Sequence, residues 1–239
     1  MTTVALIGPD GAGKTTVGRR VEALIPVPIK YVYMGVNLDS SNHMLPTTRL
    51  VRAIKRARGD APDRGGPRDP ARVTPRPKNP LRRALSEARS MVSLVLRVSE
   101  EWYRQGLAWS YERRGNIVIF DRHYYSDYYA YDIANRGRGQ PLARRIHGLM
   151  LDRVYPKPGL TIYLDAPAEV LFARKGEGTL ESLERRRQSY LQLGAQLEHF
   201  AVVDANRPLE DVARDVAELI YGFHLRSASK PTRVSDARH

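Results

Sequence analysis

The amino-acid sequence predicts an α/β fold, in which a five-stranded parallel sheet carries helices on both faces. Two observations lead to this prediction. A glycine-rich motif lies near the N-terminus between an apolar run and an amphipathic segment, and short β-rich runs then alternate with helical patterns along the chain. Such alternation is typical of parallel sheets whose strands are joined by helices. With 239 residues, the chain is long enough for one domain with a substantial core.

The glycine-rich motif reads GPDGAGKT at residues 8–15. It fits the P-loop pattern of Gly, four residues and Gly-Lys-Ser/Thr, so the predicted fold is that of a P-loop NTPase. The run TVALI before it predicts a buried strand, and the apolar positions from 17 to 25 recur at helical spacing. The alternative, a glycine-rich turn with a chance lysine, leaves both flanks unexplained.

This motif also predicts the chemistry of the site. Glycines let the backbone turn its N–H groups toward phosphate oxygens, and the helix N-terminus adds a partial positive charge. Lys14 is expected to bind the β- and γ-phosphates of ATP, and the Thr15 hydroxyl to bind Mg²⁺. The predicted cofactor-binding residues are Gly8, Asp10, Gly11, Ala12, Gly13, Lys14, Thr15 and Thr16.

Composition excludes several other classes of site. The chain has no cysteine, so a disulfide framework, a thiolate metal site and a thiol nucleophile are excluded. The first predicted strand begins so close to Met1 that we expect no signal peptide, and no apolar run approaches the roughly 20 residues that span a membrane. We therefore expect a cytoplasmic protein without a membrane span.

The formal charge of +13 is concentrated in one segment. Between Leu45 and Arg83 there are 12 lysines and arginines against 3 aspartates, or +9, which leaves +4 for the rest of the chain. Residues 39–80 are interpreted as a basic, flexible insertion that contains a short helix over Arg49–Arg56. Its role stays open between a lid, a nucleic-acid arm, a membrane-surface patch and a solvated loop. No aromatic residues interleave the basic ones, which disfavours binding to single-stranded nucleic acid.

The other elements follow from hydrophobic periodicity. A single domain is predicted over residues 1–224, followed by a basic tail at 225–239. Asp121 directly follows a buried strand, where an acidic residue of a P-loop fold lies next to Mg²⁺ and the transferred phosphoryl group. The predicted strands after the P-loop are residues 29–34, 116–120, 160–165 and 201–204, and the predicted helices are 81–114, 166–175, 181–200 and a last one from about 208.

Five tyrosines lie between positions 124 and 131. A base or sugar can stack on such rings, while core packing accounts equally well for some of them. His147, His199 and His224 have no ligand spacing and are interpreted as ordinary surface or core residues.

With these residues in place, the chain resembles the thymidylate kinase family of P-loop nucleoside monophosphate kinases. The resemblance covers residues 1–34 and about 84–222, and its most specific parts beyond the P-loop are the triplet Asp121-Arg122-His123, TIYLD at 161–165 and VDA at 203–205. It implies ATP and Mg²⁺ as cofactors and transfer of the γ-phosphate to a nucleoside monophosphate.

The resemblance also implies residue roles. Asp10 contacts the acceptor sugar, and the triplet lies between the two phosphates. Members without an arginine in the P-loop supply cations from a lid after the fourth strand, which Arg174 and Lys175, with Arg185 or Arg187, resemble here. The implied catalytic residues are Lys14, Asp121, Arg122, Arg174 and Arg187, and the candidate acceptor-binding residues are Asp10, Arg97, Arg104, Arg122, Tyr125 and Tyr128.

Two departures concern the acceptor half. The sequence YMGV at 33–36 stands where the family has a Thr-Arg-Glu-Pro-like stretch. The long-helix arginine that the family uses on the acceptor falls on Glu100, which is expected to repel a phosphate unless Arg97 or Arg104 turns inward instead. We therefore expect that thymidine monophosphate is not the preferred acceptor.

Three functions are compatible with these observations. The first is a Mg–ATP-dependent kinase of a nucleoside monophosphate or related small anionic acceptor. The second is a kinase of a sugar, a sugar phosphate or a nucleic-acid end, and the third is a non-enzymatic nucleotide-binding scaffold. The intact Lys14, Thr15 and Asp121 disfavour the third, and nucleic acid is the less favoured partner. A homodimer is compatible with the sequence.

Overall fold

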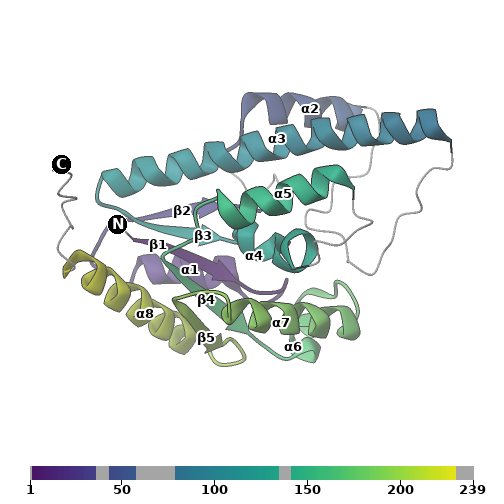
Figure 1. The fold of residues 1–239 in the computed structure, drawn as a ribbon. Helices are drawn as coiled ribbons and strands as arrows, with labels where there is room; N and C mark the ends of the chain where they lie inside the picture. Colours follow the sequence, from purple (N-terminus) through teal and green to yellow (C-terminus); the bar gives the residue numbers. More distant parts are fainter. Residues whose placement is uncertain (1, 36–42, 58–78, 135–140, 230–239) are drawn as a thin grey trace.

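The computed structural model describes residues 2–35, 43–57, 79–134 and 141–229. Its five strands form one parallel sheet in the order β2-β3-β1-β4-β5 (Figure 1). This confirms the predicted fold class, and the first and fourth strands have the predicted bounds. The strands are β1 (Thr3–Ile7), β2 (Ile29–Tyr33), β3 (Ile117–Asp121), β4 (Leu160–Asp165) and β5 (Phe200–Asp204).

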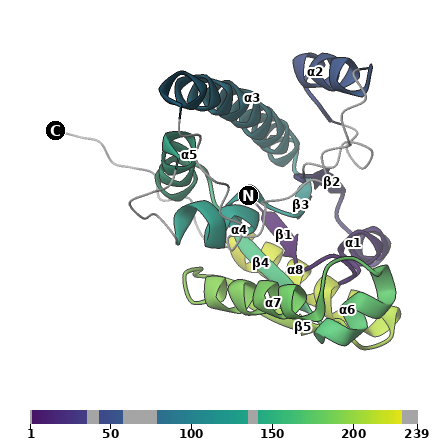
Figure 2. The same ribbon diagram turned by 90° about the vertical axis from the view of Figure 1, so that its right-hand side faces the viewer.

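Helices cover both faces of the sheet, as predicted (Figures 1 and 2). Alternate side chains of β1 point to opposite faces, so Val4 and Leu6 belong to one hydrophobic cluster and Ala5 and Ile7 to the other. Helices α1 and α8 pack on the first face, and α3, α4 and α5 on the second. The helices are α1 (Lys14–Glu22), α2 (Pro46–Ala57), α3 (Pro80–Arg113), α4 (Tyr124–Tyr128), the π-helix η2 (Tyr129–Ile133), α5 (Leu142–Arg153), α6 (Ala168–Lys175), α7 (Leu180–Gly194) and α8 (Leu209–Ser229).

The long helix α3 agrees with its prediction to within one residue at each end. Asn79 caps it by accepting a hydrogen bond from the Leu81 amide at 2.9 Å, and Pro80 occupies the first turn. Gly115 follows its end with a φ of 81°, a conformation that glycine adopts readily. Helix α2, the observed form of the predicted basic helix, lies away from the sheet in both views, and its Thr48 hydroxyl donates to Glu100 of α3. Most of the rest of the predicted insertion lies outside the described residues.

Three parts of the fold differ from the sequence-based expectation. Helix α5 and the π-helix η2 were not predicted, because their apolar and polar residues show no clear single period. Helix α7 ends at Gly194 rather than at Phe200, since Gln196 and Leu197 turn back to bond the carbonyls of Leu193 and Gly194. Helix α8 continues to Ser229, past the predicted start of the tail, and is tied down where His224 Nδ1 lies 2.9 Å from Thr2 Oγ1.

A buried ionic cluster joins α3, η2 and α5. His147 Nδ1 lies 2.7 Å from Asp132 Oδ2, and its Nε2 lies 3.0 Å from Glu101 Oε1. The side chains of all three residues are at most 1% exposed, and Arg144 also bonds Asp132 at 2.8 Å. A carboxylate only accepts, so both contacts are hydrogen bonds when the imidazole carries a proton on each nitrogen. Burial opposes that charge, but the bonds to Asp132 and Glu101 outweigh it and raise the pKa of His147.

This raised pKa predicts a pH dependence of stability. A group that binds its proton more tightly in the folded state stabilises fully below its unfolded pKa of about 6.5, and that contribution disappears as the pH rises through the folded pKa. We expect the melting temperature to fall between pH 6 and 8 in the parent protein, and to fall less in His147→Gln. His199→Gln, which alters a histidine with a 44% exposed side chain, is the control. Parallel curves for parent and His147→Gln would contradict the prediction.

Candidate phosphoryl-transfer site

The P-loop lies at the carboxyl end of the central strand β1, between β3 and β4. This is the edge at which open parallel sheets bind ligands. Gly8 and Gly11 have φ values of 150° and 92°, and a Cβ on either would lie 2.8 Å from a carbonyl oxygen, that of Leu164 or of Leu171. Glycine is therefore needed at both positions for the loop to form so close to β4 and α6.

Lys14, the first residue of α1, is folded back over this loop. Its ammonium donates to the carbonyls of Gly8 and Pro9, both at 2.8 Å, and the residue is only 6% exposed. Burial, together with the nearby charge of Arg122, lowers the pKa of Lys14 to about 8. The ammonium is held where a phosphate chain would lie along the loop, so the predicted phosphate-binding role is geometrically possible.

Thr15 and Asp121 meet as the sequence predicted for a metal site. The Thr15 hydroxyl donates to Asp121 Oδ2 at 2.6 Å, and the Tyr31 hydroxyl donates to the same oxygen. Asp121 Oδ1 is buried and has no hydrogen-bond partner among the described residues. A hydroxyl oxygen beside an unpartnered carboxylate oxygen is the type of ligand set that Mg²⁺ prefers, so the residues present fit the implied ion.

Arg122 links the loop to the segment after β3. It adopts a φ of 67°, which is uncommon for a residue other than glycine. Its guanidinium donates to Asp10 Oδ1 and lies 3.8 Å from Asp127 Oδ2, and Tyr190 donates to the other oxygen of Asp127 at 3.1 Å. Burial and the two aspartates act oppositely on Arg122, and the aspartates prevail, because the pKa of the guanidinium is raised.

The Asp10 carboxylate contacts cationic side chains from several elements. Besides Arg122, Arg186 Nη1 lies 3.4 Å from Asp10 Oδ2, and Lys175 Nζ lies 4.0 Å from Oδ1. Burial disfavours ionisation of Asp10, but these cations and Lys14 outweigh it and lower the pKa to about 2. The carboxylate therefore stays charged at neutral pH, at the place where the resemblance puts the acceptor sugar.

The predicted lid cations are placed differently from one another. Lys175 lies beside Asp10, as does Arg186 of α7, which was not among the predicted lid cations. Arg187 instead forms a bidentate pair with Asp165 at the end of β4, with contacts of 2.7 and 2.9 Å. Arg174 donates twice to the carbonyl of Ala205, both at 3.1 Å. In this structure, Arg174 and Arg187 therefore support the ends of β4 and β5, and the sequence analysis had not chosen Arg186.

Glu100 does not have the surroundings expected from the sequence. Its Oε1 pairs with Arg104 at 3.0 Å, and its Oε2 accepts from the Leu45 amide at 3.1 Å and the Thr48 hydroxyl at 2.9 Å. The carboxylate is paired and hydrogen-bonded, and Arg104 is thus the inward-turned arginine that the sequence analysis named as the exception to repulsion of an acceptor phosphate. The Arg104 guanidinium is fully engaged by these and other contacts. The residue is 1% exposed, and it also donates to the carbonyls of Tyr33, at 3.1 Å, and Gly35, at 2.7 Å.

The other candidate acceptor residues lie in or against the core. Tyr125 and Tyr128 are 2% and 4% exposed and belong to the cluster between the sheet and α3–α5. The Arg97 guanidinium lies 5.1 Å above the ring of Tyr128, and that ring meets His147 edge-on. These contacts account for the tyrosines as packing, and place Arg97, which is partly exposed, beside them.

Three contributors to the site were missed by sequence reasoning: Tyr31, Asp127 and Arg186. Tyr31 had a usable signal, since strand alternation places it on the same face of the sheet as Asp121. Asp127 had none, because it lies in no local motif, and Arg186 lies between the lid candidates Arg185 and Arg187 but was not chosen. His123 belongs to the predicted triplet but is fully buried, its ring nitrogens have no partner among the described residues, and burial lowers its pKa to about 3.

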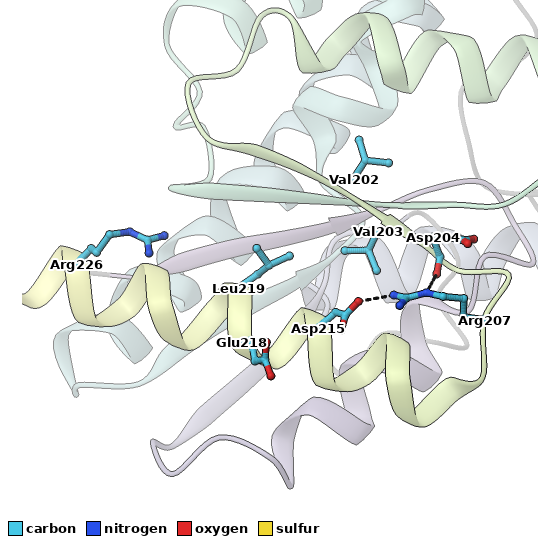
Figure 3. Close-up of a pocket in the computed structure, with 8 residues that line it drawn as sticks. All are labelled: Val202, Val203, Asp204, Arg207, Asp215, Glu218, Leu219 and Arg226. Carbon is cyan, nitrogen blue, oxygen red and sulfur yellow. Dashed lines mark hydrogen bonds and ion pairs between the residues drawn. The ribbon is translucent and has the colours of Figure 1, made fainter.

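A second hollow lies far from this chemistry, between the edge strand β5 and α8 (Figure 3). It has a volume of about 420 Å³ and contains no residue of the phosphoryl-transfer site. Arg207 crosses it, donating to the Asp204 carbonyl at 3.3 Å and pairing with Asp215. Of the charged side chains that line it, Arg207 and Asp215 are paired with each other.

The comparison with protein families decides which family this fold represents. The model of the thymidylate kinase family matches residues 86–216, more than half of the chain. The chain belongs to the thymidylate kinase family. The match runs from α3 through β5 into α8 and thus includes Asp121, Arg122 and the helices α6 and α7. The P-loop lies outside it, and is supported by its motif and geometry instead.

The chain is also similar to a protein named probable thymidylate kinase from Staphylothermus marinus. The two are 41% identical over 118 residues, which cover 46% of this chain and 55% of the relative. The chain thus spans about half the length of the curated relative that it matches. Within the described residues, no helix combines the length and apolar character needed to cross a membrane. The same residues contain no cluster of three or more acidic or histidine side chains suited to a metal ion.

Proposed function

We propose that this member of the thymidylate kinase family is a Mg–ATP-dependent phosphotransferase that moves the γ-phosphate to a nucleoside monophosphate or a related small acceptor. One observation carries the proposal. Lys14, the Thr15–Asp121 pair and the Arg122–Asp10 pair converge at the carboxyl ends of the adjacent strands β1 and β3. Donor and acceptor binding residues are thereby brought together across one site.

The residues have separate tasks in this mechanism. Phosphoryl transfer needs little covalent help from the protein, so positioning and charge neutralisation dominate. The P-loop amides and Lys14 hold the phosphate chain of ATP, while Thr15 and Asp121 hold Mg²⁺. When bound there, Mg²⁺ would supply positive charge that offsets the negative charge of the phosphates. Arg122 faces the transferred group from the side of Asp10, and an acceptor phosphate, already anionic, serves as nucleophile without a strong base.

Lys175 and Arg186 supply the remaining cations. Both approach Asp10 from the segment after β4, the place where the family resemblance puts a lid. Each has a side chain more than 40% exposed, so neither is locked by packing. We infer that Arg186 and Lys175, rather than Arg187 and Arg174, carry the lid function.

The surroundings of Glu100 bear on the identity of the acceptor. The family position for an acceptor arginine holds Glu100, and the adjacent Arg104 spends its guanidinium on Glu100 and two backbone carbonyls. Among the described residues, neither Glu100 nor Arg104 thus offers a guanidinium to an acceptor at this position, and this, rather than repulsion by Glu100, supports a preference other than thymidine monophosphate. A lost charge-assisted contact costs about 1.5–3 kcal/mol, or about ten- to a hundredfold in affinity.

The test is coupled ADP release with ATP, Mg²⁺ and a panel of nucleoside monophosphates, sugar phosphates, sugars and oligonucleotides. We expect Mg²⁺-dependent turnover with at least one nucleoside monophosphate, and a kcat/KM for thymidine monophosphate that does not lead the panel by tenfold. A tenfold lead would restore the plain family activity. ATP binding without turnover of any acceptor would favour the scaffold, and turnover of oligonucleotides alone would favour the nucleic-acid-end kinase.

A further inference from the structure

Tyr31 is an unassigned residue that touches the predicted magnesium site. We propose that Tyr31 is a positioning residue, whose hydroxyl orients the Asp121 carboxylate so that its Oδ1 is kept for the hydrated magnesium ion. The inference rests on the proposed function, because it concerns the Mg²⁺ that accompanies ATP. Tyr31 itself needs no contact with the ion, the nucleotide or the acceptor.

The two carboxylate oxygens of Asp121 have different surroundings. Oδ2 accepts hydrogen bonds from Thr15 and from Tyr31, while Oδ1 is buried and without a partner among the described residues. Two donors on one oxygen, one from α1 and one from β2, prevent the carboxylate from exchanging its oxygens by rotation. The oxygen that remains for a cation is therefore always Oδ1.

Thr15 alone does not fix the orientation of the Asp121 carboxylate, and Tyr31 adds the hydrogen bond that does. Thr15 is exposed and stands at the helix N-terminus, and its hydroxyl is itself a predicted magnesium ligand. A hydroxyl has one proton, so Thr15 restrains Asp121 only while that proton points to Oδ2. The Tyr31 ring, packed against the core, supplies a second restraint on Asp121 from a different element, β2. Partners of this kind, which orient a metal ligand without touching the metal, tune metal affinity.

Helix α1 carries a glycine where the Tyr31 ring packs against it, and a glycine inside a helix is destabilising. Gly18 is a buried residue in the interior of α1, where glycine is less favourable than alanine. A Cβ on Gly18 would lie 2.5 Å from Cε2 of Tyr31 and 3.4 Å from its Cζ. The helix therefore carries glycine at the point where the ring passes beneath it toward Asp121. Strand pairing completes the placement, since Tyr31 is in register with Ile119, two residues before Asp121 on the same face of β3.

The experiment measures ATP binding twice, with magnesium chloride and with EDTA, by calorimetry in the absence of acceptor. The ratio of the two dissociation constants reports how well the site uses the ion, separately from its affinity for nucleotide. For Tyr31→Phe, which keeps the ring, we expect this ratio to fall about tenfold while the affinity in EDTA stays unchanged. Tyr155→Phe is the matched control, since it removes a buried hydroxyl that bonds the Glu101 carbonyl away from the site.

Gly18→Ala gives an independent check, because it fills the space beside the ring without touching any polar group. Helix propensity alone predicts a neutral or stabilising change, whereas the proposal predicts the same loss of magnesium dependence as in Tyr31→Phe. An unchanged ratio in Tyr31→Phe overturns the inference, and so does an equal loss of affinity with and without magnesium. If the parent binds no ATP under either condition, the proposed function fails together with this inference. Binding by the parent with no effect of Tyr31→Phe removes the inference alone.

Discussion

Replacing Lys14 by alanine is expected to lower kcat about a hundred- to a thousandfold while leaving the fold intact. The ammonium is the cation that the P-loop itself contributes to the phosphates, and removal of one preorganised charge-stabilising donor typically costs this much. Among the described residues, the Lys14 ammonium donates hydrogen bonds to the carbonyls of Gly8 and Pro9 and to no carboxylate. Its loss therefore leaves no buried carboxylate without a partner, and a large drop in stability is not expected.

The measurement is steady-state kcat with the preferred acceptor, together with a thermal unfolding curve. Lys30→Ala is the control, because Lys30 is an exposed lysine of β2 on the same chain. It should leave both quantities unchanged. Near-normal turnover in Lys14→Ala, with a normal melting temperature, would contradict the kinase assignment rather than a detail of it.

Replacing Arg122 by alanine is expected to reduce both activity and stability. Its guanidinium holds Asp10 and faces Asp127, so its removal leaves two partly buried carboxylates without their shared cation. A charge-assisted hydrogen bond is worth about 1.5–3 kcal/mol, and we expect a loss of unfolding free energy of that order. We expect kcat/KM to fall about a hundredfold or more, because the site loses a positioned charge between donor and acceptor.

A set of variants separates these two effects. Arg122→Gly also removes the guanidinium but suits the φ of 67° better than alanine does, so it should be the more stable variant and equally inactive. Asp10→Asn combined with Arg122→Ala should cost less stability than the sum of the single changes, because each removes the same contact. Additive losses, or an active Arg122→Gly, would show that the Arg122–Asp10 pair does not organise the site.

Much of the fold could be predicted because its signals are local. The strand before the P-loop, the long helix α3 and the strand that ends in Asp121 each carry an uninterrupted apolar pattern with a clear start or stop. The segment after Tyr124 could not be predicted in the same way. A single turn of π-helix is too short to give a recognisable period of apolar residues, and η2 depends on the buried contacts of Asp132 with His147 and Arg144.

The sequence by itself determined the parallel α/β fold and the place of the P-loop on it. A P-loop is a continuous motif in which the loop, the lysine and the threonine are fixed by adjacent positions, and its place on the sheet follows from the strand before it. Asp121 could be assigned for a similar reason, since the carboxyl ends of neighbouring parallel strands meet at one edge.

Only the tertiary structure decided which cations lie beside Asp10. Arg186 and Arg187 are neighbours in sequence, but successive residues of a helix point about 100° apart, and packing of α7 turns one toward Asp10 and the other toward Asp165. Glu100 and Arg104 likewise neutralise each other because both are buried one turn apart on α3. Tyr31 reaches Asp121 because Gly18, on a different element, leaves room for its ring. The direction of a side chain around its helix or strand, and the partner that it finds there, depend on packing between elements that no local pattern records.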